Sequence, residues 1–330
     1  MSDVKGLEIS DVLGLSQPLT KLIETVSGGI GKIYEPTHIK RMAKAKSEEI
    51  KMISSSVADN ITLPVVYTNG EVSINSKDFN ELIQRTQERF LFQEVTKQNN
   101  IDSVVAKAYE ELEQEETVSE IPVDIDWTSR FFDSVANVSN EDMQDIWAKI
   151  LAGEIKRPGS FSLRTLEIVK NVTKKEAEAF QKICEIVLKL RNDYFIVSEA
   201  DIYKKYSIEF SDILLLDECG LIISNGTLSY NMKIPALQDS TISSEGYVLK
   251  IHNKLDIETK ISYGVYTLTN VGKQLFDVVK SSVNENYVCD VAEYIQKNNS
   301  SKINISIHNI TVSSPDFVFY TTEPLKEYKS

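Results

Sequence analysis

The chain has 330 residues, of which 42% are hydrophobic and 26% are charged, and its formal net charge is −13. This composition is typical of a globular protein with two or three domains, and the acidic balance argues against general nucleic-acid binding. Cys184, Cys219 and Cys289 are far apart in sequence, which excludes a clustered metal site and fits a reducing compartment.

The N-terminal residues show neither the basic nor the apolar run of a secretory signal, and no stretch of about eighteen residues is free of charge. We therefore expect a cytoplasmic protein.

Residues 17–33 carry apolar side chains at helical spacing, interrupted by closely spaced glycines. Glycines at this density either break a helix or allow close packing, and we interpret the segment as a helix, a hinge and a second helix. The alternative is a surface for assembly or for an anionic membrane, extended by the basic helix expected to begin at Pro36. Its candidate residues are Leu19, Leu22, Ile23, Val26, Gly28, Gly29, Ile30, Lys40, Arg41 and Lys44.

Asn69-Gly70 lies between two apolar runs and predicts a small hairpin. Helical spacing follows from about residue 76, and Asn99-Asn100 indicates a bend between two helices. Residues 111–120 are strongly acidic and lead to Pro122, which we interpret as a linker.

Residues 126–167 contain both tryptophans and a Phe-Phe pair. Asp126 and Ser139 are the expected N-caps of two helices, and Gly153 is the expected end of the second. A compact helical bundle is predicted, in which the core residues are Trp127, Phe131, Phe132, Trp147, Leu151 and Gly153. The charged strip Glu154, Lys156 and Arg157 after the expected helix end has no evident structural role in the sequence.

From Lys175 the pattern predicts helix, strand, helix, helix and a hairpin at Asn225-Gly226, which is the order of a winged helix. The second short helix would be the recognition helix, but it carries Asp212, Asp217 and Glu218 and no Lys or Arg. Because DNA phosphates require cations, a protein partner fits this module better than DNA.

The remaining residues alternate strand and helix, with residues 247–253 and 260–268 expected to pair. The fold class is therefore α+β, a helical N-terminal half followed by a winged-helix-like α+β part. The expected domains are N-terminal amphipathic helices, a helical hairpin or linker region, a helical bundle and the α+β domain, at residues 1–58, 59–120, 121–192 and 193–330.

The sequence contains no convincing pattern of catalytic or ligand-binding residues. His38, His252 and His308 lie in separate segments without a partner pattern, and neither a serine-hydrolase elbow nor a phosphate-binding loop is present. Acidic residues near lysines, Asp316 with Glu327 and Lys329, or Glu258 with Lys260, form only loose nuclease-like patterns. We expect no cofactor, no metal and no catalytic residue.

The runs DWTSRFF and EDMQDIWAKILAGEIKRPGSFSLRTLE resemble a bacterial family known only as a domain of unknown function. The segment GLSQPLTKLIETVSGGIGKIYEPTHIKRMAKAKSEEIKMI is similar to the start of abortive-infection alpha (Abi-alpha) proteins. The second resemblance implies an anti-phage setting, and neither resemblance supplies a catalytic residue.

We therefore expect a non-enzymatic oligomeric scaffold, sensor or effector of bacterial defence that binds itself or another protein. Nucleic acid is not an expected partner. The alternatives are a membrane-perturbing effector acting through residues 15–55 and an unrecognised metal-dependent nuclease.

Overall fold

The computed structural model describes residues 16–31, 66–68, 71–73, 76–279, 283–313 and 317–328. The chain forms two compact units, Met1–Leu166 (unit 1) and Glu167–Ser330 (unit 2). Helices dominate the N-terminal half and an antiparallel sheet dominates the C-terminal half. The expected α+β class is confirmed in this form.

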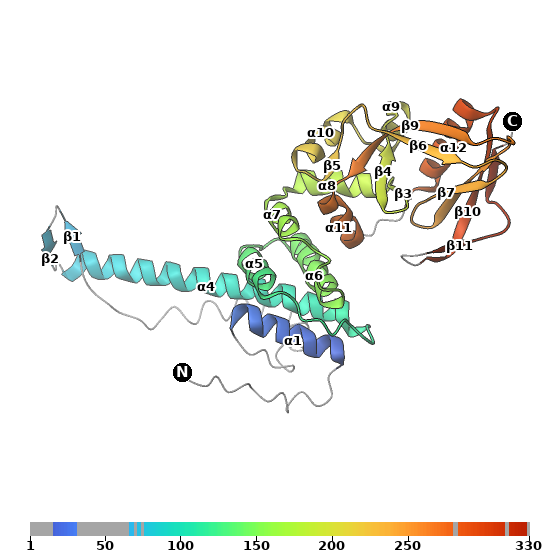
Figure 1. Cartoon of the computed structure of the whole chain (residues 1–330). Helices are drawn as coiled ribbons and strands as arrows, with labels where there is room; N and C mark the ends of the chain where they lie inside the picture. Colours follow the sequence, from blue (N-terminus) through green and yellow to red (C-terminus); the bar gives the residue numbers. More distant parts are fainter. Residues whose placement is uncertain are drawn as a thin grey trace. The chain divides into compact units, whose positions relative to one another are not determined.

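Unit 1 is built around one long helix, α4 (Ser76–Glu113), of 38 residues. Helices α1 (Gln17–Ile30), α5 (Ile125–Val135) and α6 (Glu141–Lys156) pack on its C-terminal half (Figure 1). Val104, Val105, Ala108 and Leu112 form the buried stripe of α4 at these contacts, as the helical spacing of apolar residues requires.

The bend expected at Asn99-Asn100 is wrong, because α4 continues through both residues. The side-chain amide of Asn100 is buried and donates to the carbonyl of Ala136 at 2.9 Å. An asparagine pair that reads as a helix break in the sequence is thus accommodated by a tertiary hydrogen bond.

Strands β1 (Val66–Thr68) and β2 (Glu71–Ser73) pair antiparallel, with Thr68 opposite Glu71. This confirms the small hairpin, although its turn at Asn69-Gly70 lies outside the described residues.

Two helix starts in unit 1 differ from expectation by one or two residues. The carboxylate of Asp124, not Asp126, accepts from the Trp127 backbone N–H at 2.8 Å, and the side chain of Asn140, not Ser139, caps α6. Neighbouring Asp, Asn and Ser side chains can all cap a helix, so the packing of the flanking chain decides which one does.

Unit 2 contains a ten-stranded sheet of antiparallel pairs, in the order β11-β10-β8-β7-β3-β4-β9-β5, with β12 paired to β10 and β6 paired to β9. Its strands are β3 (Leu188–Leu190), β4 (Asp193–Val197), β5 (Ile222–Ile223), β6 (Ser229–Ile234), β7 (Asp239–Ser243), β8 (Tyr247–Asn253), β9 (Thr259–Leu268), β10 (Ile303–Ser313), β11 (Val318–Tyr320) and β12 (Lys326–Tyr328). Its helices are α7 (Leu163–Asn171, which spans the unit boundary), α8 (Lys174–Cys184), α9 (Ala200–Tyr203), the 3-10 turn η1 (Lys204–Tyr206), α10 (Phe210–Glu218), α11 (Asn270–Val279) and α12 (Glu285–Asn299).

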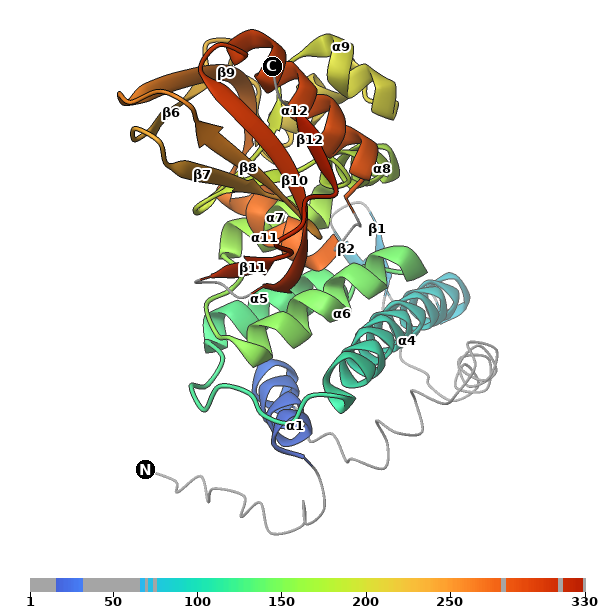
Figure 2. The same ribbon diagram turned by 90° about the vertical axis from the view of Figure 1, so that its right-hand side faces the viewer.

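Helix α12 covers one face of the sheet at β8, β10 and β12 (Figure 2). Ile303, Ile305 and Ile307 of β10 are buried, as are Leu249 and Ile251 of β8. Because side chains alternate along a strand, the residues between them lie on the opposite face, where the sequence is polar.

The hairpin expected at Asn225-Gly226 is wrong. Strands β5 and β6 exist, but both pair with β9, β5 at Thr267 and Leu268 and β6 at residues 259–264. The intervening turn is closed by the N–H of Leu228 donating to the carbonyl of Asn225 at 3.0 Å. The ten-residue strand β9 pairs with β6 over six residues and with β5 over two, and thus takes both segments as separate partners.

The pairing expected between residues 247–253 and 260–268 is also wrong. Strand β8 pairs with β7 and β10, whereas β9 pairs with β4, β5 and β6. The strands β8 and β9 follow each other in the sequence but are not neighbours in the sheet.

Gly28 and Gly29 do not break α1, which continues to Ile30 and ends at Gly31 with φ 66°. Instead, Gly29 allows close packing: a Cβ built there would lie 2.5 Å from Thr128 Cγ2 and 2.6 Å from Phe132 Cδ2. A Cβ at Gly28 would meet only Ile125 Cδ1 at 3.6 Å. Of the two sequence readings, close packing is confirmed at Gly29.

These neighbouring glycines give a matched pair of variants. We expect Gly29→Ala to destabilise unit 1 by about 1–3 kcal/mol through overpacking, and Gly28→Ala to be neutral or stabilising by up to about 1 kcal/mol through helix propensity. Tryptophan fluorescence during urea unfolding measures unit 1 alone, because both tryptophans lie there. Equal effects of the two substitutions would contradict this account of α1.

Candidate functional site

The predicted assembly or membrane surface on α1 is part of the core of unit 1. Leu19, Leu22 and Val26 are buried against helices that include α5, while Ile23, Gly29 and Ile30 are half-buried and Gly28 is exposed. This face is therefore occupied within the unit and is not open to a membrane. Lys40, Arg41 and Lys44 lie outside the described residues.

A buried cation reinforces the attachment of α1. The ammonium of Lys21 donates to the carbonyls of Ser119 and Ile121, and its side chain is 8% exposed. Burial lowers the pKa of Lys21, although Glu24 and Glu120 act in the opposite direction. Lys21 thus fixes the acidic segment that precedes α5 to α1, and we assign it a structural role.

The aromatic residues of the family-like motif form one stacked cluster between α5 and α6. Phe131 lies at its centre, with ring centroids 5.1 Å from Trp127, 5.2 Å from Phe132 and 5.4 Å from Trp147. Leu151 lies one turn after Trp147 on α6, and both residues are fully buried. Edge-to-face and stacked aromatic pairs each add about 0.5–1.5 kcal/mol beyond burial, so this cluster stabilises the unit.

Gly153 does not end α6, which corrects the sequence prediction; the helix continues to Lys156. A Cβ at Gly153 would lie 2.7 Å from Phe161 Cε2. The glycine is needed because the ring of Phe161 packs directly on the helix backbone at this point.

The charged strip after Gly153 is explained by Glu154. Glu154 is 2% exposed, and its carboxylate accepts from the backbone N–H of Gly159 at 2.6 Å and of Phe161 at 2.9 Å. Burial raises the pKa of Glu154, and these backbone hydrogen bonds partly oppose the shift. Lys156 pairs with Glu115 at 2.6 Å, and Arg157 is exposed. The strip therefore holds the Pro158-Gly159 turn rather than a ligand.

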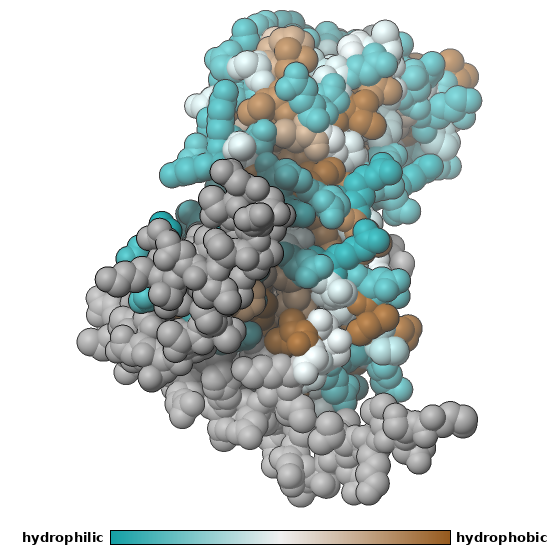
Figure 3. Space-filling view, turned by 90° about the vertical axis from the view of Figure 1, so that its left-hand side faces the viewer, coloured by the Kyte–Doolittle hydropathy of each residue, from teal (hydrophilic) through white to brown (hydrophobic). Residues whose placement is uncertain are grey.

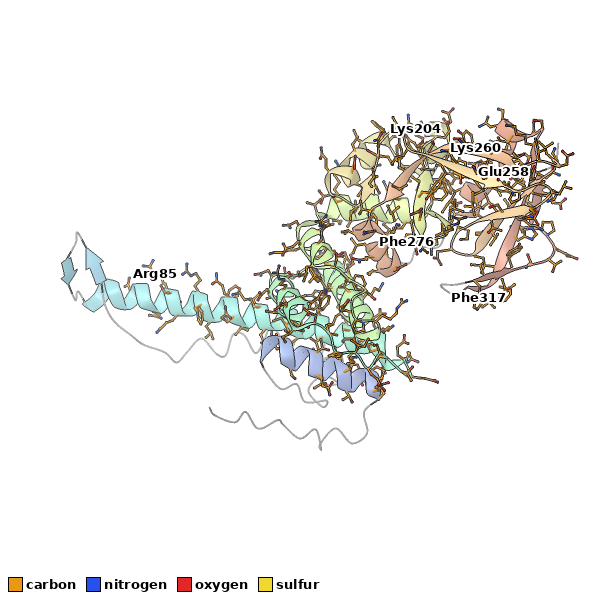
Figure 4. All side chains as sticks on the ribbon, in the orientation of Figure 1. Arg85, Lys204, Glu258, Lys260, Phe276 and Phe317 are labelled. Atoms are coloured by element: carbon orange, nitrogen blue, oxygen red, sulfur yellow. The ribbon has the colours of Figure 1, made fainter. Side chains whose placement is uncertain are left out.

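Residues 84–94, in the N-terminal half of α4, form an exposed helical surface in the described part of unit 1. From Gln84 to Glu94, all side chains are exposed except Gln87 and Leu91, which are half-buried. Phe90 is 64% exposed and Phe92 is 67% exposed. Arg85 projects from this stretch of α4 (Figure 4). Two large exposed aromatic side chains on a stretch of helix that the other described residues leave uncovered are typical of an interaction surface.

Helix α10 is the segment that the sequence pattern predicts as a recognition helix. Asp212 closes a capping box with Glu209, and Asp217 accepts from the Ser224 hydroxyl at 2.6 Å. Phe210 and Leu214 are exposed on the same helix. The helix thus presents acidic and apolar groups, which suits a protein partner better than a phosphate backbone.

The sheet of unit 2 brings together polar residues that the sequence leaves far apart. Asp239 of β7, His252 and Lys250 of β8, and Ser306 and His308 of β10 lie on the face opposite α12, because His252 is the Cα partner of Asp239 and Lys250 is the partner of Ser306. We call these five residues the polar sheet face.

Two hydrogen-bonded groups occupy the polar sheet face. Asp239 bonds to His252 Nδ1 at 2.7 Å and to Lys250 Nζ at 2.9 Å. Burial acts to raise the pKa of Asp239, but the hydrogen bonds from Lys250 and His252 outweigh it and lower the pKa. In the second group, Ser306 Oγ lies 2.9 Å from His308 Nε2.

Sequence reasoning missed this face because it treated His252 and His308 as isolated. The alternation of residues 302–310 already places Ser306 and His308 on one side of a strand. The register with β8 was not readable from the sequence, and it is this register that adds Lys250 and His252.

The nuclease-like patterns gain no support from geometry. Glu258 and Lys260 lie near each other at the start of β9 (Figure 4), and Glu258 pairs with Lys233 at 3.6 Å. Asp316 and Lys329 lie outside the described residues. Within the described part of the chain, no three His, Cys, Asp or Glu side chains are grouped so as to hold a metal ion. In the same residues, no helix combines the length and the apolar character needed to cross a membrane.

The role of Glu154 can be tested by Glu154→Gln. We expect a loss of about 1–3 kcal/mol, because the Gln amide group turns a donor toward one of the two backbone N–H groups. Since the pKa of Glu154 is raised on folding, the unfolded chain ionises first as pH increases above about 4.3, and the stabilisation by Glu154 decreases as pH rises through its folded pKa. The stability difference between the wild type and Glu154→Gln should therefore be larger at pH 4 than at pH 7.

Thermal melts followed by tryptophan fluorescence at both pH values measure this difference. Glu110→Gln is the matched control, because Glu110 is exposed on α4. A difference that grows from pH 4 to pH 7 would contradict the assignment.

Comparison with known proteins gives one family. The model of the family described as Protein of unknown function (DUF2806) matches residues 84–292, from the exposed part of α4 to α12. No curated protein and no solved structure matches the chain. Because the match covers more than half of the chain, the protein belongs to the DUF2806 family.

Proposed function

We propose that the protein acts by protein–protein interaction, as a homo-oligomeric scaffold, sensor or effector, and that the N-terminal half of α4 mediates its assembly. The observation that carries this proposal is the exposure of Phe90 and Phe92 on a stretch of α4 that no other described element covers. Since residues two apart on a helix project to nearly opposite sides, one interface would bury one of the two phenylalanine side chains, which would stabilise it by about 1.5–3 kcal/mol.

The charges on this stretch support a second copy of the chain as the partner. Arg85 and Arg89 alternate with Glu88 and Glu94. In an antiparallel pair of α4 helices centred between Glu88 and Arg89, Glu88 of each copy would face Arg89 of the other, and Phe92 would lie on the same face of the helix. Such a two-fold arrangement uses the same surface on both copies.

In unit 2 we propose a winged-helix-like module used for protein binding. The order α8, β4, α9, α10 supports it, and the strands β5 and β6 that follow both pair with β9. The acidic and apolar surface of α10 supports a protein partner rather than a nucleic acid. On the face drawn in Figure 3, hydrophobic groups of the described residues are scattered among hydrophilic ones, so a contact there would combine apolar and polar interactions.

The proposed biological setting is bacterial anti-phage defence in the cytoplasm. It rests on the resemblance of the N-terminal segment to Abi-alpha proteins and on three unpaired cysteines. We do not propose membrane perturbation, because the apolar residues of α1 that would have to insert into a bilayer are buried in unit 1.

Assembly is tested by size-exclusion chromatography with light scattering on the full chain. We expect the wild type to be oligomeric at micromolar concentration and the double variant Phe90→Glu, Phe92→Glu to be monomeric, since two charges would replace the buried apolar contacts. Ile121→Glu is the control, because Ile121 is an equally exposed apolar residue of unit 1 outside α4. A strictly monomeric wild type would reject the proposal.

The antiparallel register makes a sharper prediction. Glu88→Arg and Arg89→Glu should each weaken dimerisation by several-fold, because an exposed ion pair contributes about 0.2–1 kcal/mol and each variant removes two pairs. Combining both substitutions should restore the wild-type dissociation constant, measured by sedimentation equilibrium at low salt. If the combined variant is as weak as the two effects added, the register is wrong.

A further inference from the structure

The imidazole of His308 is held in a single tautomer. Its Nδ1 lies 2.7 Å from the carbonyl oxygen of Thr321, and its Nε2 lies 2.9 Å from Ser306 Oγ. A carbonyl can only accept, so Nδ1 carries the proton and donates. Nε2 of the neutral ring then has a free lone pair, and the Ser306 hydroxyl donates to it.

The surroundings keep this pair in place. His308 is 4% exposed, and the ring of Tyr320 lies 5.2 Å from the imidazole, which limits its rotation. Ser306 is only half-buried, so its hydroxyl is the accessible member of the pair. The base is thus shielded and oriented, while the hydroxyl can meet a reagent.

The residue paired with Ser306 on the neighbouring strand β8 is a lysine. Lys250 is the Cα partner of Ser306, and Lys250 Nζ is bound by Asp239 at 2.9 Å. The hydrogen bond to Asp239 raises the pKa of Lys250, which keeps the ammonium charged. Directly opposed residues have Cα atoms about 4.5–5.5 Å apart, so Lys250 neighbours Ser306 on the polar sheet face while its ammonium is bound by Asp239 of β7.

We propose that Ser306 is a nucleophile and His308 its general base, and that together they form an acyl-transfer site on the polar sheet face for an ester or another activated acyl donor. Thr321, through its carbonyl, is a positioning residue, and Lys250 keeps its positive charge on the same face through its bond to Asp239. The combination of nucleophile, base and orienting acceptor is the general pattern of activated serine.

The proposed step balances without any further reagent. Ser306 Oγ attacks the acyl carbon while its proton moves to His308 Nε2. The tetrahedral oxyanion collapses, the bond to the leaving oxygen breaks, and that oxygen takes the proton from Nε2. Water then attacks the acyl-serine by the same route, with His308 again accepting a proton, and releases the carboxylic acid and free Ser306.

This inference goes beyond the assembly role and departs from the expectation of a chain without catalysis. Ser306, His308 and Thr321 lie on β10 and just after β11, outside the residues matched by the family model. Assembly through α4 and chemistry on the polar sheet face lie in different units, so either can fail without the other.

The test uses an alkyl fluorophosphonate, which phosphonylates an activated serine with loss of fluoride. Incubated with the full chain, it should label Ser306 stoichiometrically, as located by peptide mass spectrometry. Labelling should disappear in 6 M urea, because the activation depends on the folded strand. Absence of label on Ser306 in the native wild type would overturn the proposal without reference to any variant.

Variants separate activation from simple exposure. Ser306→Ala should remove the label, and His308→Gln should slow labelling by about 100-fold or more, the usual contribution of a general base. Ser229→Ala, an exposed strand serine on β6, should label at the wild-type rate. Equal labelling rates in the wild type and in a folded His308→Gln variant, with folding checked by circular dichroism, would show that His308 is only structural.

Discussion

The packing of unit 1 depends on the buried carboxylate of Glu154. Its two oxygens accept from the backbone of Gly159 and Phe161 and thereby fix the turn after α6. The fixed turn places the ring of Phe161 against Gly153. It also places the backbone carbonyl of Phe161 2.8 Å from Trp127 Nε1, which donates to it. Because Trp127 belongs to α5, one acidic side chain at the end of α6 sets how the two helices meet. Burying a charge is costly, and it is tolerated here because both oxygens are satisfied.

In unit 2 the two longest strands play the organising role. Strand β9 pairs with β4, β5 and β6, and β10 pairs with β8, β11 and β12. Each long strand thus collects short ones that would be marginal alone. The register of β10 on β8 buries isoleucines under α12 and, by the same alternation, gathers the polar sheet face on the other side.

The two proposals rest on different physics. Assembly through α4 rests on apolar surface that the other described residues leave uncovered, and its strength should come from burying an exposed phenylalanine side chain such as that of Phe92. The acyl-transfer site rests on hydrogen-bond geometry that fixes a tautomer. The family match includes the exposed helix and ends before β10, so the first feature lies within the matched region and the second outside it.

Local sequence patterns were sufficient to predict the α+β class, the helical motif core and the hairpin of β1 and β2. These features depend on local propensity and periodicity, which are written in neighbouring residues. Tertiary structure alone decided that Gly153 and Gly29 are packing sites, that Asn100 does not bend α4, and that Asn225-Gly226 does not form a hairpin. It also decided which histidines meet which partners. These outcomes depend on contacts between residues that are distant in sequence, where a Phe161 ring or a longer strand competes with the local preference.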